Sequence, residues 1–240
     1  MKKLYNQVRH SKQLIFLDLE GTQFTHELIA IGALKVTLTR KGTIKRRGDT
    51  LKMYVKPKNS IGRYVVQLTG ITKEILENEG LPFDVVLERF KKFIGRNISK
   101  TKYVTFGAHD MRILRQSAKY TPEADHEFIK TIGKRTVDLS AIINEYVKDG
   151  KNTYSLTNLC KLFEVPLIEP AHDPLNDALM LAGLYDSLFK NTDLIVGKYR
   201  EMLLGLTKIP RPYKKLIQKI VKEGQATSDD FEKFIREEIE

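Results

Sequence analysis

The sequence predicts an α/β fold in which a mixed central sheet is flanked by helices. Strand-like apolar runs come first along the chain, and strand-like and helical patterns then alternate. The first three strand-like runs indicate an antiparallel meander, while strands separated by helices add a parallel part. At 240 residues the chain is long enough to bury a substantial core.

The individual elements follow from the spacing of apolar residues. Strands are expected near 14–19, 28–38, 50–56, 102–107 and 135–138. Helices, in which apolar residues recur three and four apart, are expected at 83–95, 110–119, 139–148, 155–164 and 174–190. After Asn191 a basic stretch containing "PRP" precedes an acidic end, "SDDFEKFIREEIE". We therefore expect a main domain over 12–190 and a basic helical extension over 191–240.

The charge of the chain favours a polyanionic partner. Lys and Arg number 41 against 30 Asp and Glu, which leaves a net charge of +11. Between Lys35 and Arg63 lie ten basic residues and a single acid, Asp49. This stretch is either a solvated hairpin tip or a surface that contacts phosphates.

Cysteine content and hydropathy bear on the compartment. The single cysteine, Cys160, lies in an apolar helical pattern and cannot form an internal disulfide, which fits a reducing cytosol. The first apolar run is short and is interrupted by Asp18, so it does not resemble a secretory signal. No apolar window approaches the length of a membrane span. We therefore expect a soluble cytoplasmic protein that does not enter a membrane.

Two acids stand at the end of the first expected strand, "LIFLDLE". Alternate residues of a strand point to the same side, so Asp18 and Glu20 project together. Two neighbouring carboxylates beside a core repel each other unless a cation or a proton compensates them. The pair therefore predicts either a metal site or a solvated strand end.

Two later stretches bring further groups of the same chemistry. In "YVTFGAHDMRIL" an expected strand leads through Gly107 to Asp110 at the start of a helix. In "EPAHDPLNDA" His172 precedes a helix start with a capping acid and a proline, and Asp177 falls one turn inside that helix. Each residue also has an ordinary explanation: a helix cap, a loop histidine and a solvated helix acid.

Taken together, four acids and a histidine form a coherent chemical set. Hard divalent ions such as Mg²⁺ bind carboxylates together with phosphate oxygens, and two such ions can stabilise the attacking and leaving oxygens of a displacement. A histidine can take the proton from an attacking water. The set therefore predicts hydrolysis of a phosphodiester.

The motifs "FLDLEGT", "LTGIT" at 68–72, "FGAHD" and "HDPLNDA" resemble the DEDD exonuclease superfamily in order and spacing. The resemblance is to its histidine-bearing DEDDh branch, which includes the proofreading epsilon subunit of bacterial replicative polymerase, oligoribonuclease and ribonuclease T. It covers roughly residues 12–190. It implies a ribonuclease H-like fold, with an exonuclease domain over that range.

The same resemblance implies roles for particular residues. Two Mg²⁺ or Mn²⁺ ions would be held by Asp18, Glu20, Asp110 and Asp177, with His172 as general base. The terminal nucleotide would lie against Leu19, Gly21, Thr22, Leu68 and Thr69, the last two in the "LTGIT" loop.

The expected activity is that of a 3′→5′ exonuclease that releases nucleoside 5′-monophosphates from single-stranded DNA or RNA. One alternative is a catalytically inert ribonuclease H-like module that binds nucleic acid or a polymerase. Another is an enzyme for a different phosphate ester, such as a dinucleotide. A polymerase or other protein partner stays open at this point.

Overall fold

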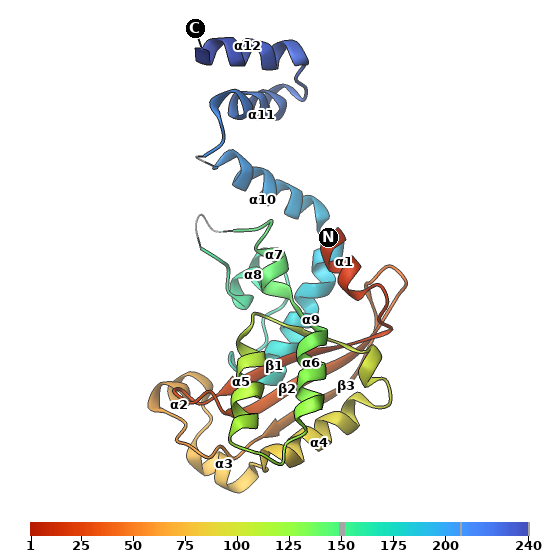
Figure 1. The fold of residues 1–240 in the computed structure, drawn as a ribbon, viewed down its shortest axis with the longest axis vertical. Helices are drawn as coiled ribbons and strands as arrows, with labels where there is room; N and C mark the ends of the chain where they lie inside the picture. The colour runs from red at the N-terminus through yellow and green to blue at the C-terminus, as the bar shows by residue number, and fades with distance from the viewer. Residues whose placement is uncertain (149–151, 207, 240) are drawn as a thin grey trace. The chain divides into compact units, whose positions relative to one another are not determined.

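The computed structural model describes residues 1–148, 152–206 and 208–239 (Figure 1). The chain forms two compact units. The first contains Met1–Glu145 and Tyr154–Thr192, and the second contains Tyr146–Thr153 and Asp193–Glu240. The division into an exonuclease domain over 12–190 and an extension over 191–240 stays a prediction.

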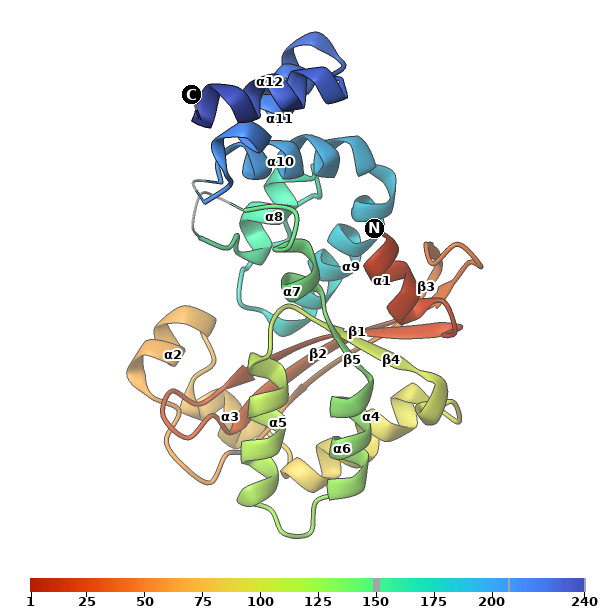
Figure 2. The same cartoon turned by 45° about the horizontal axis from the view of Figure 1, so that its top comes forward.

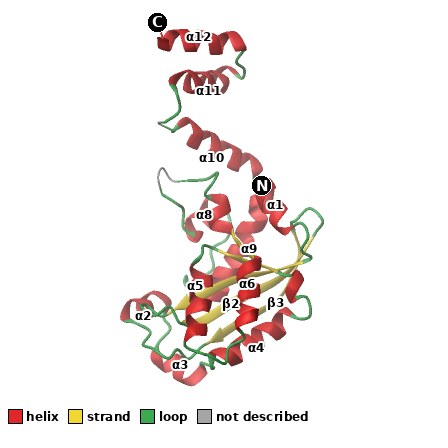
Figure 3. Cartoon of the chain, viewed as in Figure 1, coloured by secondary structure: helices red, strands yellow, loops and turns green. Residues whose placement is uncertain are grey.

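A five-stranded mixed sheet forms the centre of the first unit (Figure 3). Its strands are β1 (Gln13–Gly21), β2 (Leu28–Leu38), β3 (Ile44–Tyr54), β4 (Lys102–Thr105) and β5 (Thr136–Asp138), in the order β3-β2-β1-β4-β5. The first three strands pair antiparallel, whereas β4 pairs parallel with both β1 and β5. The predicted meander, parallel part and mixed sheet are therefore confirmed.

Helices cover both faces of this sheet (Figure 2). Those of the first unit are α1 (Lys2–Val8), α2 (Arg63–Thr69), α3 (Lys73–Glu79), α4 (Phe83–Ile94), η1 (Ile98–Lys100), α5 (His109–Lys119), α6 (His126–Arg135), α7 (Leu139–Ile143), α8 (Leu156–Leu162) and α9 (Pro174–Lys190). Figure 2 shows α4, α5 and α6 on one face, and α7 and α9 on the other.

The apolar run of β1 is continuous because both faces of that strand are covered. Ile15 and Leu17 join the core formed with α4, α5 and α6. Phe16 points to the opposite face, where its ring packs against Tyr185 of α9 at 5.3 Å. Asp18, two residues further along, therefore points to the α9 face at the point where apolar packing ends.

Some predicted element boundaries were wrong. Strand β3 begins at Ile44 instead of residue 50, because its first half is an edge strand of exposed charged residues without an apolar pattern. Helix α7 ends at Ile143 and a turn follows, so the expected helix over 139–148 is shorter. The "LTGIT" segment is not purely a loop, because Leu68 and Thr69 close α2. Helices α1, α2, α3 and α6 were not predicted.

One glycine of β2 determines how closely α9 approaches the sheet. Gly32 pairs with Asp18 of β1, and a Cβ atom at this position would lie 2.0 Å from the carbonyl carbon of Pro174. The first turn of α9 therefore lies against the backbone of β2, which only a residue without a side chain permits. This contact brings the start of α9 next to Asp18.

Replacing Gly32 tests this contact. We expect Gly32→Ala to lower the free energy of unfolding by about 1–3 kcal/mol, because the added methyl group must displace the start of α9. Gly133→Ala in α6 is the control, since its nearest neighbour is the flexible end of Arg115 at 4.0 Å. Urea unfolding should show a loss for Gly32→Ala alone, and equal stabilities would contradict the close packing.

The second unit contains three helices among its described residues. They are α10 (Thr192–Leu204), α11 (Arg211–Glu223) and α12 (Ser228–Ile239). The basic α11 is tied to the acidic α12 by ion pairs, including Lys215 to Glu237 at 2.7 Å and Lys219 to Asp230 at 2.5 Å. Among the described residues of the whole chain, none of the helices has the length and apolar character of a membrane span.

Candidate active site

The end of β1 supplies the first two acids of the site. Asp18 and Glu20 project from the face covered by α9, and both are partly buried. The pairing with β2 becomes irregular between Glu20 and Gly21, so regular pairing stops just after these acids. Their carboxylates are thus held by a strand of the central sheet, as the sequence spacing predicted.

Helix α5 adds the third acid. Asp110 lies in its first turn, is 5% exposed, and accepts a 2.9 Å hydrogen bond from the backbone N–H of Leu19. The helix cap is Ala108, so the explanation of Asp110 as a helix cap does not hold. The preceding loop is fixed by Asp138, which accepts a 3.0 Å hydrogen bond from the N–H of Gly107. Asp110 is therefore oriented toward β1.

The start of α9 supplies the remaining two groups. Asp173 caps this helix by accepting hydrogen bonds from the N–H groups of Leu175 and Asn176, as predicted. Its carboxylate also forms a 2.5 Å ion pair with Lys52 of β3, which ties the helix start to the sheet. His172 precedes the cap and Asp177 lies one turn inside, so both project toward the end of β1.

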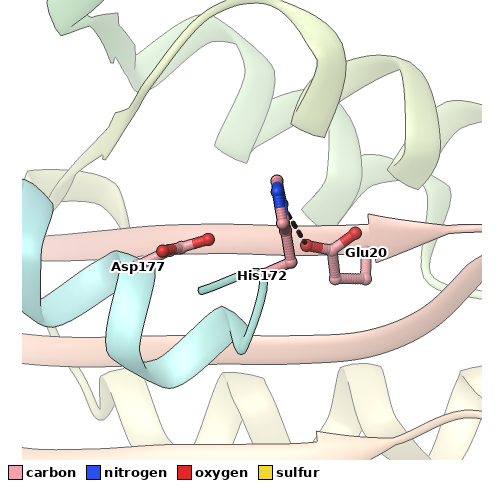
Figure 4. A group of neighbouring side chains, drawn as sticks. All are labelled: Glu20, His172 and Asp177. Carbon is pink, nitrogen blue, oxygen red and sulfur yellow. Dashed lines mark ion pairs between the residues drawn. The ribbon is translucent and has the colours of Figure 1, made fainter. Parts of the chain in front are cut away.

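The side chains of Glu20, His172 and Asp177 lie close together, between the end of β1 and the start of α9 (Figure 4). His172 Nδ1 lies 4.0 Å from Glu20 Oε1. One ligand atom from each of Glu20, His172 and Asp177 lies within 4.8 Å of the others. The imidazole of His172 is about half exposed, so one side of it faces solvent.

Burial raises the pKa values of the four acids, and repulsion from nearby carboxylates adds to the shifts. Burial raises the pKa of Asp18 well above its ordinary value, and repulsion from Asp110 and Asp177 adds to the shift. Burial, followed by repulsion from Asp177, raises the pKa of Glu20 to about 8. Burial also raises the pKa of Asp110 to about 7 and the pKa of Asp177 in the same direction. Without a cation, the cluster is costly to ionise.

This cluster fits divalent cations. Four carboxyl groups from β1, α5 and α9 line one cleft, and none of its described lining residues is a lysine or an arginine. Carboxylate oxygens are the ligands that Mg²⁺ and Mn²⁺ prefer. A bound cation would reverse the pKa shifts by favouring the ionised form. The assignment of Asp18, Glu20, Asp110 and Asp177 as the metal ligands stays a prediction, and of these Glu20 and Asp177 lie with His172 in one group of close ligand atoms.

The raised pKa values predict an unusual pH dependence for the metal-free protein. Between about pH 4 and pH 8 these carboxyl groups are ionised in the unfolded chain, whereas in the folded chain they still hold protons because their pKa values are raised. The folded state then binds more protons, so the free energy of unfolding should fall as pH rises through this range. Urea unfolding in excess chelator should show greater stability near pH 5 than near pH 8. Equal stabilities would contradict the burial of the cluster.

A cleft of about 480 Å³ opens beside the acids. Leu19, Gly21, Thr22 and Leu68, four of the five residues expected to contact the terminal nucleotide, line it. Thr69 is not among the lining residues, and its hydroxyl donates to the carbonyl of Val65 inside α2. The hydroxyl of Thr22 is engaged as well, since it accepts a 2.9 Å hydrogen bond from the N–H of Glu27.

The sequence assigned no role to several other residues that line the cleft. His26 and His109 form an edge-to-face ring pair with centroids 5.3 Å apart, and both line the cleft. Burial lowers the pKa of both imidazoles, and the nearby Arg112 guanidinium acts in the same direction. Tyr64, an exposed aromatic on the unpredicted helix α2, also lines the cleft. The one available signal was His109, which directly precedes Asp110.

Comparison with known proteins places this chain in a family. The family model RNase_T, described as an exonuclease, matches residues 15–185. A curated relative is the PolC-type DNA polymerase III of Caldanaerobacter subterraneus subsp. tengcongensis, 25% identical over 176 residues. That match covers 72% of this chain but 11% of the polymerase, so the chain spans a small part of that relative.

Solved structures share the fold. Cell-death related nuclease 4 (CRN-4) has a TM-score of 0.63 and 23% identity, over 75% of this chain and 64% of that one. The nuclease domain of 3′hExo, a DEDDh family member solved with bound rAMP, has a TM-score of 0.62 and 18% identity, over 76% of this chain and 94% of that one. E. coli Exonuclease I, solved with a dA16 oligonucleotide, has a TM-score of 0.59 and 15% identity, over 87% of this chain and 46% of that one. With the family model spanning most of the first unit, this chain belongs to the exonuclease family and has the fold of its DEDDh members.

Proposed function

We propose that this protein is a 3′→5′ exonuclease that removes nucleoside 5′-monophosphates from single-stranded DNA or RNA. The observation that carries the proposal is the convergence of four carboxyl groups and His172, from three separate elements, at the wall of one open cleft. The other wall, from α2, presents Tyr64, Val65 and Leu68, which suit the apolar faces of a terminal nucleotide. The catalytic domain in this proposal is residues 12–190.

The proposed mechanism assigns roles to the residues of this chain. Asp18, Glu20, Asp110 and Asp177 would hold two Mg²⁺ or Mn²⁺ ions, which when bound would stabilise charge on the attacking and leaving oxygens. His172, with its half-exposed ring, takes the proton from the attacking water. The hydrogen bond from Leu19 N–H to Asp110 keeps that carboxylate oriented. The terminal nucleotide lies against Leu19, Gly21 and Thr22.

The relatives support a nucleic-acid substrate. The solved relatives include a nuclease domain with bound rAMP and an exonuclease with a DNA oligonucleotide. A 3′-exonuclease with a TM-score of 0.60 and 16% identity, matched over 76% of this chain and 83% of that one, is described as recognising a histone mRNA stem-loop. DNA and RNA are therefore both substrates to test. The PolC match makes a polymerase a partner to test as well.

One assay tests the proposal directly. Single-stranded DNA and RNA of matched sequence, labelled at the 5′ end, are incubated with Mg²⁺ or Mn²⁺ and sampled over time. We expect a ladder of products that shorten by one nucleotide, and no ladder when the 3′ end is blocked by a phosphate. Tight binding of the strands without any shortening would contradict the proposal and favour an inert binding module.

A further inference from the structure

A second cavity lies on the other side of α2 from the cleft beside the acids, which is called the catalytic cleft from here on. It has a volume of about 600 Å³ and lies between the loop at 56–62 and helices α2 and α3. Helix α2 separates the two spaces: Tyr64 and Leu68 line the cleft, whereas Arg63 and Val66 line the cavity. A ligand that leaves the cleft past α2 would meet this cavity.

The cavity combines cations with an apolar floor. Lys56, Lys58, Arg63 and Lys73 line it together with one acid, Glu77. Glu77 is 3.3 Å from Lys73, so that pair neutralises itself. Lys56, Lys58 and Arg63 are exposed and make no ion pair within the described part of the chain. The floor is apolar and is formed by Ile61, Val66 and Leu76.

The loop that carries Lys56 and Lys58 is held by hydrogen bonds, and Arg63 follows it as the first residue of α2. The carboxylate of Glu27, 3% exposed, accepts hydrogen bonds from the N–H groups of Lys58 at 2.8 Å and Asn59 at 3.1 Å. The carbonyl of Ile61 accepts a 2.8 Å hydrogen bond from the N–H of Gln23, which lines the catalytic cleft. Lys56 and Lys58 are therefore presented on a preorganised loop joined to the cleft wall, which lowers the entropic cost of ordering this loop when a ligand binds.

We propose that this cavity binds a nucleotide of the substrate strand upstream of the one in the catalytic cleft. Unpaired cations attract the phosphate, and the apolar floor accepts the face of a base, which is the combination that single-stranded nucleic acid recognises. The inference rests on the proposed exonuclease function and deepens it, because it assigns the strand a path around α2.

The structure favours this cavity over the other basic residues near it in sequence. Arg46 and Arg47 of β3 are paired with the successive residues Thr37 and Val36 of β2, so the two arginines point to opposite faces of the sheet. They therefore do not form one phosphate-binding surface. The residues Lys45, Arg46 and Arg47 carry the same total charge as Lys56, Lys58 and Arg63 and provide a charge-matched control.

Strand binding in chelator tests the proposal without cleavage. Fluorescence anisotropy of a labelled single strand is measured over a salt titration for wild type, for K56Q/K58Q/R63Q and for K45Q/R46Q/R47Q. We expect K56Q/K58Q/R63Q, the cavity variant, to bind the strand about 10- to 100-fold more weakly than wild type near 0.1 M salt. The slope of log affinity against log salt concentration should become less steep by up to about 2. K45Q/R46Q/R47Q, the β3 variant, should lose much less affinity for the strand. Unchanged thermal unfolding of both variants establishes that the fold is kept.

Three outcomes would overturn the proposal. They are wild-type affinity in the cavity variant, equal losses in both variants, and a free nucleoside monophosphate that occupies the cavity as tightly as a strand does. The failure of this inference differs from that of the proposed function. If the wild-type protein shortens strands and the cavity variant binds them with wild-type affinity, only the proposed role of the cavity is refuted. If the wild-type protein shortens no strand, the proposed exonuclease function is refuted. Anisotropy in chelator then still tests whether the cavity binds a strand.

Discussion

Asp18→Asn should reduce strand shortening by at least about 10³-fold while the fold stays intact. The carboxylate of Asp18 is repelled by those of Asp110, Asp177 and Glu20, so it belongs to the acid cluster. Metal ions contribute several kcal/mol of transition-state stabilisation, and each tenfold in rate corresponds to about 1.36 kcal/mol. Single-turnover assays with a labelled strand and Mg²⁺ or Mn²⁺ measure the effect. Asp49→Asn, on exposed β3, is the matched control and should keep wild-type activity.

The same substitution should stabilise the metal-free protein. The amide that replaces the Asp18 carboxylate carries no charge, so its burial costs less and the repulsion from Asp110 and Asp177 is removed. We expect a higher unfolding temperature than wild type at pH 8 in excess chelator. We expect the order to reverse when divalent ions are added, because wild type alone keeps the complete ligand set. A rate that survives in Asp18→Asn, or in wild type with chelator, would contradict the metal assignment.

His172→Ala should reduce turnover by about 10²–10⁴-fold, the usual cost of removing a general base. His172 lies outside the capped first turn of α9 and projects half-exposed toward the cleft, where it can reach a bound water. Affinity for a single strand, measured in chelator, should stay close to that of wild type. The loss should therefore appear in the rate at saturating substrate.

An exposed histidine of α6 provides the control for this prediction. His126→Ala should leave both rate and affinity unchanged, because the side chain lies at a separate surface. Equal losses of rate and affinity in His172→Ala would instead identify a histidine that clamps the strand. Loss of stability in this variant would identify a structural role for its contact with Glu20.

The sequence by itself predicted the elements whose apolar patterns are long and regular. Helix α9 was predicted with its observed bounds, because a capping acid, a proline and a long apolar repeat all mark it. The short helices α2 and α3 were missed since each has seven residues, too few for a periodic pattern to stand out. Strand β3 was misplaced because an edge strand does not need buried residues.

The five candidate catalytic residues could be named from sequence because strand periodicity and helix-start signals are local. Their convergence could not be derived locally, since Asp18, Asp110 and Asp177 are far apart in the chain. The tertiary structure brings these acids together. The hydrogen bond from Leu19 N–H orients Asp110 toward β1, and the absence of a side chain at Gly32 lets the start of α9 approach the sheet. The pKa shifts, the cleft wall of Tyr64 and the cation-lined cavity likewise depend on burial and packing, which arise only when distant segments fold together.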